Sequence, residues 1–153
     1  ADLPWRFQPD PKAVGLAEGW ASAGWNDSDW AQIQIGKPWE SQGYRDLDGW
    51  AWYRLRIKVP ASWVNQRVYL TFEGVDDCYE LFVDGALVTR RGDPQRRVDT
   101  FNERFSHDLT DRMQPGSSHV VAVRVFDWYG AGGIFRPVTL STAPALPVTD
   151  VLN

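Results

Sequence analysis

Short runs with an apolar residue at every second position recur along this chain, and they constrain its fold more than any other feature. In residues 51–59 the apolar positions alternate with tryptophan, arginine and lysine, and residues 119–126 repeat the pattern. A period of two is typical of a β-strand that buries one of its faces. We therefore predict a strand over 51–59 whose second face, opposite the core, carries Trp52 and Arg54 together.

The other regular segments are also predicted to be strands, separated by turn residues. Asp84-Gly85 between two apolar runs is a strong hairpin signal, and Pro137 within the last run places that strand at a sheet edge. A long polar loop is expected over 90–104. Short strands at regular intervals, with no convincing helix, predict an all-β sandwich of Greek-key or jelly-roll type. The further predicted strands are 32–35, 67–73, 78–83, 87–88, 105–109 and 134–140.

The length of 153 residues fits one domain with one core. We predict a β-sandwich domain over 1–142, followed by a tail or the start of a linker over 143–153, where Pro144 and Pro147 stand. No apolar run approaches the roughly 20 residues of a membrane span, and the chain does not open with a charged-then-apolar signal segment. We therefore expect no membrane partner.

Charge and the types of metal-binding residue argue against several function classes. The net charge is −4, so the chain lacks the general basic field that nucleic-acid binding needs. The single cysteine, Cys78, excludes an internal disulfide, and with only His107 and His119 beside it no zinc-site spacing exists. We assign these histidines no chemistry, and we predict no cofactor and no nucleic-acid partner.

Nine tryptophans are more than a core of this size needs, and large rings with a polar atom are often placed at binding surfaces. Those in residues 1–36 are predicted to close an end of the sandwich. Two loops, 39–50 and 127–133, combine rings and polar side chains with glycines. We expect these loops at the same end of the sandwich, with 74–79 and 91–104 as walls.

The rings and polar groups of these two loops match the chemistry of a sugar. The C–H face of a pyranose can lie on an indole or phenol ring, and its hydroxyls need donors and acceptors around them. Trp50, Trp128 and Tyr129 are the expected platforms. Two alternatives stay open: Trp52 as a plug on the sheet face, and Arg54 as the partner of a buried carboxylate such as Asp77. The candidate carbohydrate-binding residues are Tyr44, Asp46, Asp48, Trp50, Trp52, Arg54, Asp127, Trp128 and Tyr129.

Four arginines in the 90–104 loop suggest a second class of ligand. Guanidinium groups bind sulfate or carboxylate through two parallel hydrogen bonds, so an anionic polysaccharide is one interpretation. The other, which we favour, is a solvated loop balanced by Asp93 and Asp99. The secondary anionic-glycan candidates are Arg90, Arg91, Arg96 and Arg97.

Oxygen ligands of the kind that calcium prefers gather at Asn26, Asp27 and Asp29. Three side chains within four residues do not make a site, so a structural calcium is left as an unsupported alternative and no metal site is predicted.

A glycosidase needs two carboxylates at a fixed separation. Glu40 or Glu73 with Asp48 or Asp76 would supply them, but no motif pairs them, and no nucleophile elbow, metalloprotease helix or phosphate loop is present. We therefore predict that this domain is not itself an enzyme.

Several short motifs stand in a characteristic order. They are Trp39-Glu40 with Gly43-Tyr44; Trp52-Tyr53-Arg54 before Val59-Pro60; Gly74-Val75-Asp76-Asp77 with Val83-Asp84-Gly85; His107-Asp108-Leu109-Thr110; and Val123-Arg124-Val125 with Gly132-Gly133-Ile134-Phe135-Arg136-Pro137-Val138. This order resembles the sugar-binding domain of glycoside hydrolase family 2, a jelly roll of the galactose-binding-like superfamily. The resemblance spans about Trp5 to Leu140.

The resemblance implies carbohydrate contact without turnover, because in family 2 enzymes the catalytic glutamates lie on a separate barrel. The hypothesis is a non-catalytic carbohydrate-binding module of a secreted or periplasmic polysaccharide-degrading enzyme, with a glycoside hydrolase catalytic domain in the same parent chain. The alternative is a structural accessory domain that braces or completes the active site of a neighbouring catalytic domain.

Overall fold

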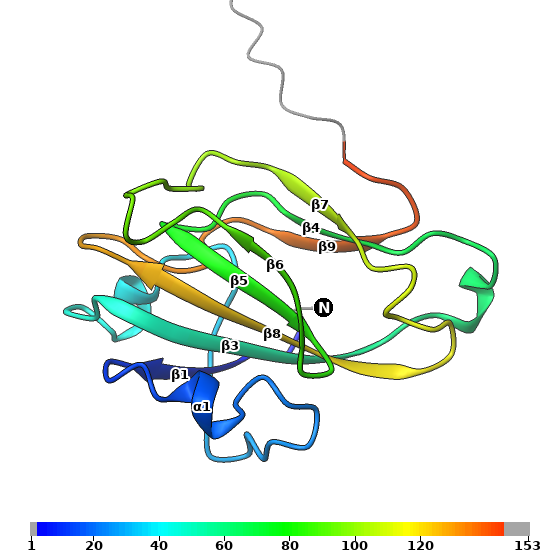
Figure 1. Cartoon of the computed structure of the whole chain (residues 1–153), viewed down its shortest axis with the longest axis horizontal. Helices are drawn as coiled ribbons and strands as arrows, with labels where there is room; N and C mark the ends of the chain where they lie inside the picture. The colour runs from blue at the N-terminus through cyan, green and yellow to red at the C-terminus, as the bar shows by residue number, and fades with distance from the viewer. Residues whose placement is uncertain (1–2, 146–153) are drawn as a thin grey trace, which may run out of the picture.

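The computed structural model describes residues 3–145, which form two antiparallel β-sheets packed face to face (Figure 1). The all-β sandwich predicted from the sequence is therefore confirmed. The predicted boundary at residue 142 stays a prediction, since most of the predicted tail, 143–153, lies outside the described residues. In the described part the last strand ends at Ser141.

The larger sheet has six strands in the order β2-β1-β3-β8-β5-β6. Its centre is the pair β3 and β8, which runs in unbroken antiparallel register from Gly49 opposite Asp127 to Lys58 opposite Ser118. The strands of this sheet are β1 (Arg6–Asp10), β2 (Ala31–Gln32), β3 (Gly49–Lys58), β5 (Cys78–Val83), β6 (Ala86–Arg91) and β8 (Ser118–Asp127).

The smaller sheet has three strands in the order β7-β4-β9; β9 lies at its edge, as predicted for the last strand, but it begins after Pro137 rather than at residue 134. Its strands are β4 (Tyr69–Phe72), β7 (Phe105–Asp108) and β9 (Val138–Ser141). Helical turns are few and short: α1 (Gly15–Glu18), η1 (Trp39–Gln42) and η2 (Ala61–Trp63). Within residues 3–145, no helix has the length and apolar character needed to cross a membrane.

The main core lies between the two sheets and follows the alternation seen in the sequence. Tyr53 and Leu55 of β3 point into it, as do Val123 of β8 and Phe72 of β4, and none of the four is more than 2% exposed. The turn between β5 and β6 is also as predicted. Asp84 and the following glycine both have positive φ, 48° and 87°, which is the backbone of a two-residue hairpin turn.

The outer face of the six-stranded sheet is where the structure departs from the prediction. Residues 11–30, which include α1, lie against this face rather than closing an end of the sandwich (Figure 1). Trp20 and Trp30 pack there against Trp52, so Trp52 is fully buried and Arg54 is 1% exposed. The expectation that β3 has one buried face is therefore wrong, because the N-terminal segment forms a second small core over the other.

Candidate functional site

Four segments that are distant in sequence meet at one end of the sandwich, which we call the loop end: 39–48, 74–77, 92–104 and 128–134. The Trp39 N–H donates to the Gly132 carbonyl at 3.0 Å, and Gly133 and Asp76 exchange two backbone hydrogen bonds of 2.9 and 3.0 Å. The Thr100 hydroxyl donates to the Val75 carbonyl at 2.8 Å. The predicted meeting of the 39–50 and 127–133 loops, with 74–79 and 91–104 as walls, is confirmed.

Three aspartates converge in this loop end. The carboxylates of Asp76, Asp77 and Asp127 each offer an oxygen within 4.8 Å of the other two. The Asp77 carboxylate accepts the Trp128 N–H at 2.9 Å. Burial, followed by the nearby Asp77 carboxylate, raises the pKa of both Asp76 and Asp127. Asp127 was predicted to bind sugar, but its side chain is fully buried among acidic groups.

A pocket of about 580 Å³ opens beside the loop end, on the outer face of the six-stranded sheet, and we call it the Trp50 pocket. Trp50 of β3 and Phe126 of β8 lie opposite each other in the strand register, with ring centroids 5.1 Å apart. The Arg124 guanidinium lies 4.1 Å from the centroid of the Trp50 ring. The pocket is lined by Trp50, Cys78, Tyr79, Glu80, Arg90, Arg91, Gly92, Asp93, Pro94, Gln95 and Phe126.

Glu80 organises the polar side of the Trp50 pocket. Its two oxygens accept hydrogen bonds from Arg90, at 2.8 Å, and from Arg124. Sequence reasoning missed Glu80 and Arg124, although the signal was present. In β5 the positions that alternate with the core residues Tyr79 and Leu81 had to face outward, toward the same side as Trp50.

The aromatic rings predicted to contact sugar differ in how far they are exposed to solvent. Tyr129 is 75% exposed in the 128–134 segment. Trp128 is half-buried, donates its indole N–H to the Pro94 carbonyl at 3.0 Å, and has the Arg97 guanidinium 5.7 Å from its ring centroid. Tyr44 packs edge-on against Phe7 at 4.7 Å, alongside the core. Of these three rings only Tyr129 is freely exposed, although Phe101 in the 92–104 segment is also 43% exposed.

Two predicted sugar ligands lie in the interior. The Trp52 indole N–H donates to the Asp10 carboxylate at 3.0 Å, and the Arg54 Nε donates to the Asp27 carboxylate at 2.9 Å. Neither side chain presents a surface to solvent, so both are structural in this fold. Trp52 is thus a plug on the outer sheet face, and Arg54 pairs with Asp27, which is partly exposed, rather than with Asp77. Asp46 and Asp48 are exposed in the loop before β3.

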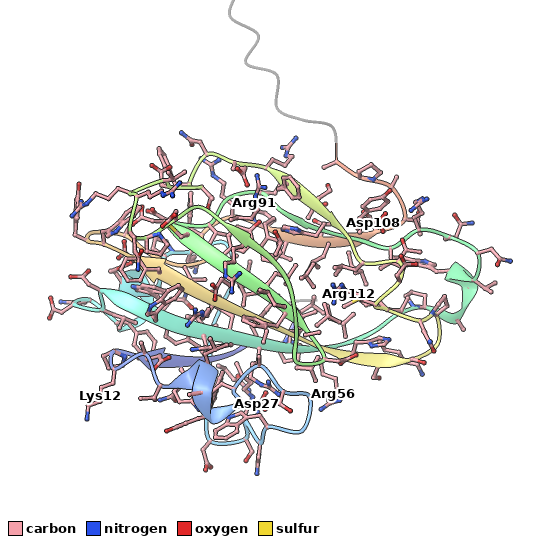
Figure 2. All side chains as sticks on the ribbon, viewed as in Figure 1. Lys12, Asp27, Arg56, Arg91, Asp108 and Arg112 are labelled. Atoms are coloured by element: carbon pink, nitrogen blue, oxygen red, sulfur yellow. The ribbon has the colours of Figure 1, made fainter. Side chains whose placement is uncertain are left out.

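Three of the four arginines predicted as anion ligands form ion pairs. Arg90 pairs with Glu80 at 2.8 Å, Arg91 with Glu103 at 2.8 Å, and Arg96 with Asp93 at 3.7 Å. Figure 2 labels Arg91 at the end of β6, on the side of the smaller sheet. This arrangement fits the balanced, solvated loop better than a cluster of unpaired positive charge.

Two of the oxygen ligands near Asn26 are engaged by the chain itself. The Asn26 side chain accepts the Ser28 N–H at 3.0 Å, and the Asp27 carboxylate is held by Arg54. Figure 2 shows Asp27 in the N-terminal segment that covers the sheet. The carboxylates that do converge, at the loop end, come from three chain positions whose proximity the sequence did not reveal.

Comparison with known proteins identifies the domain. A family model described as "Glycosyl hydrolases family 2, sugar binding domain" matches residues 5–144. The chain belongs to this family. The family 2 domain is a non-catalytic one, so the fold and the absence of turnover expected from the sequence motifs agree with the match.

Several relatives of this family 2 domain are much longer proteins. A β-galactosidase of Psychromonas ingrahamii is 23% identical over 96% of this chain, and one of Bacteroides ovatus is 27% identical over 90%. This chain spans 16% and 17% of their respective lengths. A β-glycosidase structure from Bacteroides vulgatus superposes with a TM-score of 0.71 at 26% identity, covering 93% of this chain and 20% of that one. A β-glucuronidase from an uncultured Clostridium species superposes with a TM-score of 0.74 at 24% identity, covering 92% and 28%, and supports the fold alone.

Proposed function

We propose that this domain binds carbohydrate without turning it over, and that the sugar occupies the Trp50 pocket. The observation that carries the proposal is the pairing of half-buried rings, Trp50 and Phe126, with the charged hydrogen-bonding groups of Glu80 and Arg90 in one concave site. A pyranose needs both an aromatic surface for its C–H face and donors and acceptors for its hydroxyls.

The charges around the Trp50 pocket favour a sugar recognised through its hydroxyls. Glu80 is held between two arginines, and its side chain is 10% exposed, whereas the Arg90 side chain is 66% exposed. Arg90 can therefore donate to a sugar oxygen while Glu80 fixes its position. Because Arg91 and Arg96 are also paired, a sulfated or uronic-acid chain would find little unbalanced positive charge.

The wider context completes this proposal. Several curated relatives are named β-galactosidase or β-glucuronidase, and this chain spans about a sixth of the lengths of these relatives. The parent protein would then be a polysaccharide-degrading glycoside hydrolase with a catalytic domain in the same chain. Such an enzyme would act outside the cytoplasm, in secreted or periplasmic form, because a polysaccharide is too large to enter intact. Fractionation of the source cells with an antibody to this domain checks the location.

Calorimetric titration of the domain tests the binding, using a panel of neutral galactans, mannans, xylans and glucans together with sulfated forms. Trp50→Ala should weaken binding about tenfold, since a stacked ring contributes on the order of 1 kcal/mol. Trp63→Ala is the matched control, because Trp63 is also half-buried but lies in η2, away from the pocket. Equal losses in both variants, or no binding to any glycan, would contradict the proposal. A preference for sulfated chains would instead favour the arginines of the 90–104 loop as the binding site.

A second candidate function, bracing of a neighbouring domain, rests on an apolar groove of about 320 Å³ between β3 and β9. Trp63 and Leu140 line it, and Leu3, at its rim, is 54% exposed. A catalytic domain of the same parent chain is the occupant that this surface would fit. In the full-length parent, Leu3→Asp should lower the melting temperature of the catalytic domain, whereas glycan binding by the isolated domain stays unchanged. An unaltered parent protein would exclude bracing through this groove.

A further inference from the structure

The acidic cluster of the loop end contains a side chain whose hydrogen-bonding capacity the described chain does not satisfy. Asp127 is 0% exposed, and in residues 3–145 neither of its carboxylate oxygens has a hydrogen-bond partner. Buried polar groups in folded proteins are almost always paired, and a buried carboxylate without a partner carries a large desolvation cost. A ligand that is positively charged or donates hydrogen bonds would therefore stabilise Asp127.

Glu40 adds a third unsatisfied carboxylate oxygen to the two of Asp127. Its Oε2 accepts the Gly132 N–H at 2.9 Å, whereas its Oε1 is buried and has no partner among the described residues. Gly132 lies in contact with both acids, because its N–H donates to Glu40 and a Cβ at this position would lie 2.7 Å from the Asp127 carboxylate. Glycine at residue 132 thus keeps open the space in which Glu40 and Asp127 approach each other.

The charges that act most strongly on this cluster are all negative. For Asp76, the largest influences after burial are Asp77, Asp99 and Glu40, and for Asp127 they are Asp77, Asp76 and Glu40. The arginines at the two ends of the 92–104 segment are engaged by other acids: Arg104 contacts Glu73, and Arg91 pairs with Glu103. Several carboxylates are thus held close together without a neutralising side chain among their main neighbours.

We propose that Asp76, Asp77 and Asp127, with Glu40 beside them, bind a calcium ion. The ligands are hard carboxylate oxygens, without sulfur or nitrogen, which selects calcium or magnesium over zinc and copper. Calcium accepts six to eight oxygens in irregular geometry, whereas magnesium requires a near-regular octahedron and retains its waters. Four carboxyl groups from two loop segments and the end of a strand suit the larger and less exacting ion, and half-buried Asp76 and Asp77 leave an opening for water ligands.

Such an ion would join the parts of the loop end. Asp127 ends β8, Asp76 and Asp77 follow β4, and Glu40 lies in η1. A calcium ion bound to all three segments would fix the 128–134 loop, which carries Tyr129, relative to the sheet. This inference concerns stability and local order, and it holds whether or not the Trp50 pocket binds sugar.

Terbium provides a direct probe, because Tb³⁺ replaces Ca²⁺ and luminesces when a nearby tryptophan is excited. Trp39 is close enough for this transfer. A Cβ at Gly132 would lie 2.6 Å from the Trp39 ring and 2.7 Å from the Asp127 carboxylate, so the ring and the carboxylate are close neighbours. After treatment with EDTA, the domain should show tryptophan-sensitised terbium emission that calcium displaces and magnesium does not. Calcium at a hundred times its dissociation constant should raise the melting temperature by about 5 °C or more.

Asp127→Asn is the decisive variant, because it removes a carboxylate without removing a hydrogen bond to another residue of 3–145. It should lose both the terbium emission and the calcium-induced rise in melting temperature, yet without metal it should melt at or above the wild-type temperature, since repulsion is relieved. Asp111→Asn, at an exposed aspartate in the loop after β7, should behave as wild type. No effect of calcium on the wild type, or an unchanged calcium response in Asp127→Asn, would overturn the proposal and leave shared protons as the means of neutralising the cluster.

Discussion

The indole N–H of Trp52 donates to the carboxylate of Asp10 at 3.0 Å, and both side chains are buried. The same carboxylate accepts the backbone N–H groups of Val14 and Gly15 at 2.8 and 3.0 Å. Asp10 thereby fastens the start of the N-terminal segment to the centre of β3. A Cβ at Gly15 would lie 2.5 Å from the Trp52 indole nitrogen, so the segment and the ring fit without spare room.

Trp52→Phe should destabilise the domain by about 3 kcal/mol. The smaller ring leaves a cavity beneath Trp20, and Asp10 loses one of its three donors. Urea unfolding followed by circular dichroism measures the change. Glycan binding should persist at temperatures where the variant is folded, because Trp52 does not line the Trp50 pocket. A loss below 1 kcal/mol would show that the second small core contributes little.

Arg54→Met should cost about 3–5 kcal/mol, because it leaves buried acceptors without a partner. Arg54 donates to the Asp27 carboxylate and to the carbonyls of Trp20, at 2.6 Å, and Ser22, at 2.9 Å. Limited proteolysis should show faster cleavage within residues 11–30. The control is Arg67→Met, whose pair with Asp108 is exposed on both sides and is expected to contribute less than about 1 kcal/mol. Similar losses in the two variants would refute the structural role of Arg54.

Gly133→Ala should destabilise the domain by more than about 2 kcal/mol, for two reasons. The φ angle of Gly133 is 104°, and a Cβ there would collide with the Tyr53 hydroxyl. That hydroxyl accepts the Ile134 N–H at 3.2 Å and joins the loop end to β3. Gly130→Ala separates the two effects, because its φ is 80° but a Cβ would meet nothing within 4 Å. Thermal melts of both variants should therefore differ, and equal melting temperatures would count against the contact.

Stability should fall as the pH is lowered from about 6.5 toward 4, through His107. Burial, with a smaller effect from the Arg91 charge, lowers the pKa of His107 to about 4. The unfolded chain takes up the proton near pH 6.5 and the folded one does not, so lowering the pH favours unfolding, by up to about 3 kcal/mol over this range. Tyr79 and the ring of Phe72 enclose the imidazole.

Urea unfolding at pH 7 and pH 4.5 checks this prediction. His107→Gln keeps an acceptor for the Tyr79 hydroxyl, which lies 2.8 Å from the imidazole, but does not titrate. The variant should lose less stability than the wild type between the two pH values, since only the contribution of His107 is removed. Identical pH dependence in both proteins would mean that His107 is not the responsible group.

Most of the strands could be predicted from the sequence because their signals are local. The alternation in 51–59 and 119–126 gave β3 and β8, and Asp84-Gly85 gave the hairpin between β5 and β6. The candidate site was predicted only in outline. The meeting of the two loops was expected because both combine rings, polar side chains and glycines. Glu80, which pairs with both Arg90 and Arg124 in the pocket, was predicted only as a strand residue.

The sequence by itself determined which residues lie on the same face of each strand, because side chains alternate with a period of two whatever surrounds them. Only the tertiary structure decided which of those faces meets solvent. Trp52 and Arg54 share a face as predicted, yet Trp20 and Asp27, more than 25 residues earlier in the chain, bury it. Asp76 and Asp127 approach each other for the same kind of reason. Burial and charge proximity depend on contacts between distant segments, and an irregular segment carries no periodic signal of where it will pack.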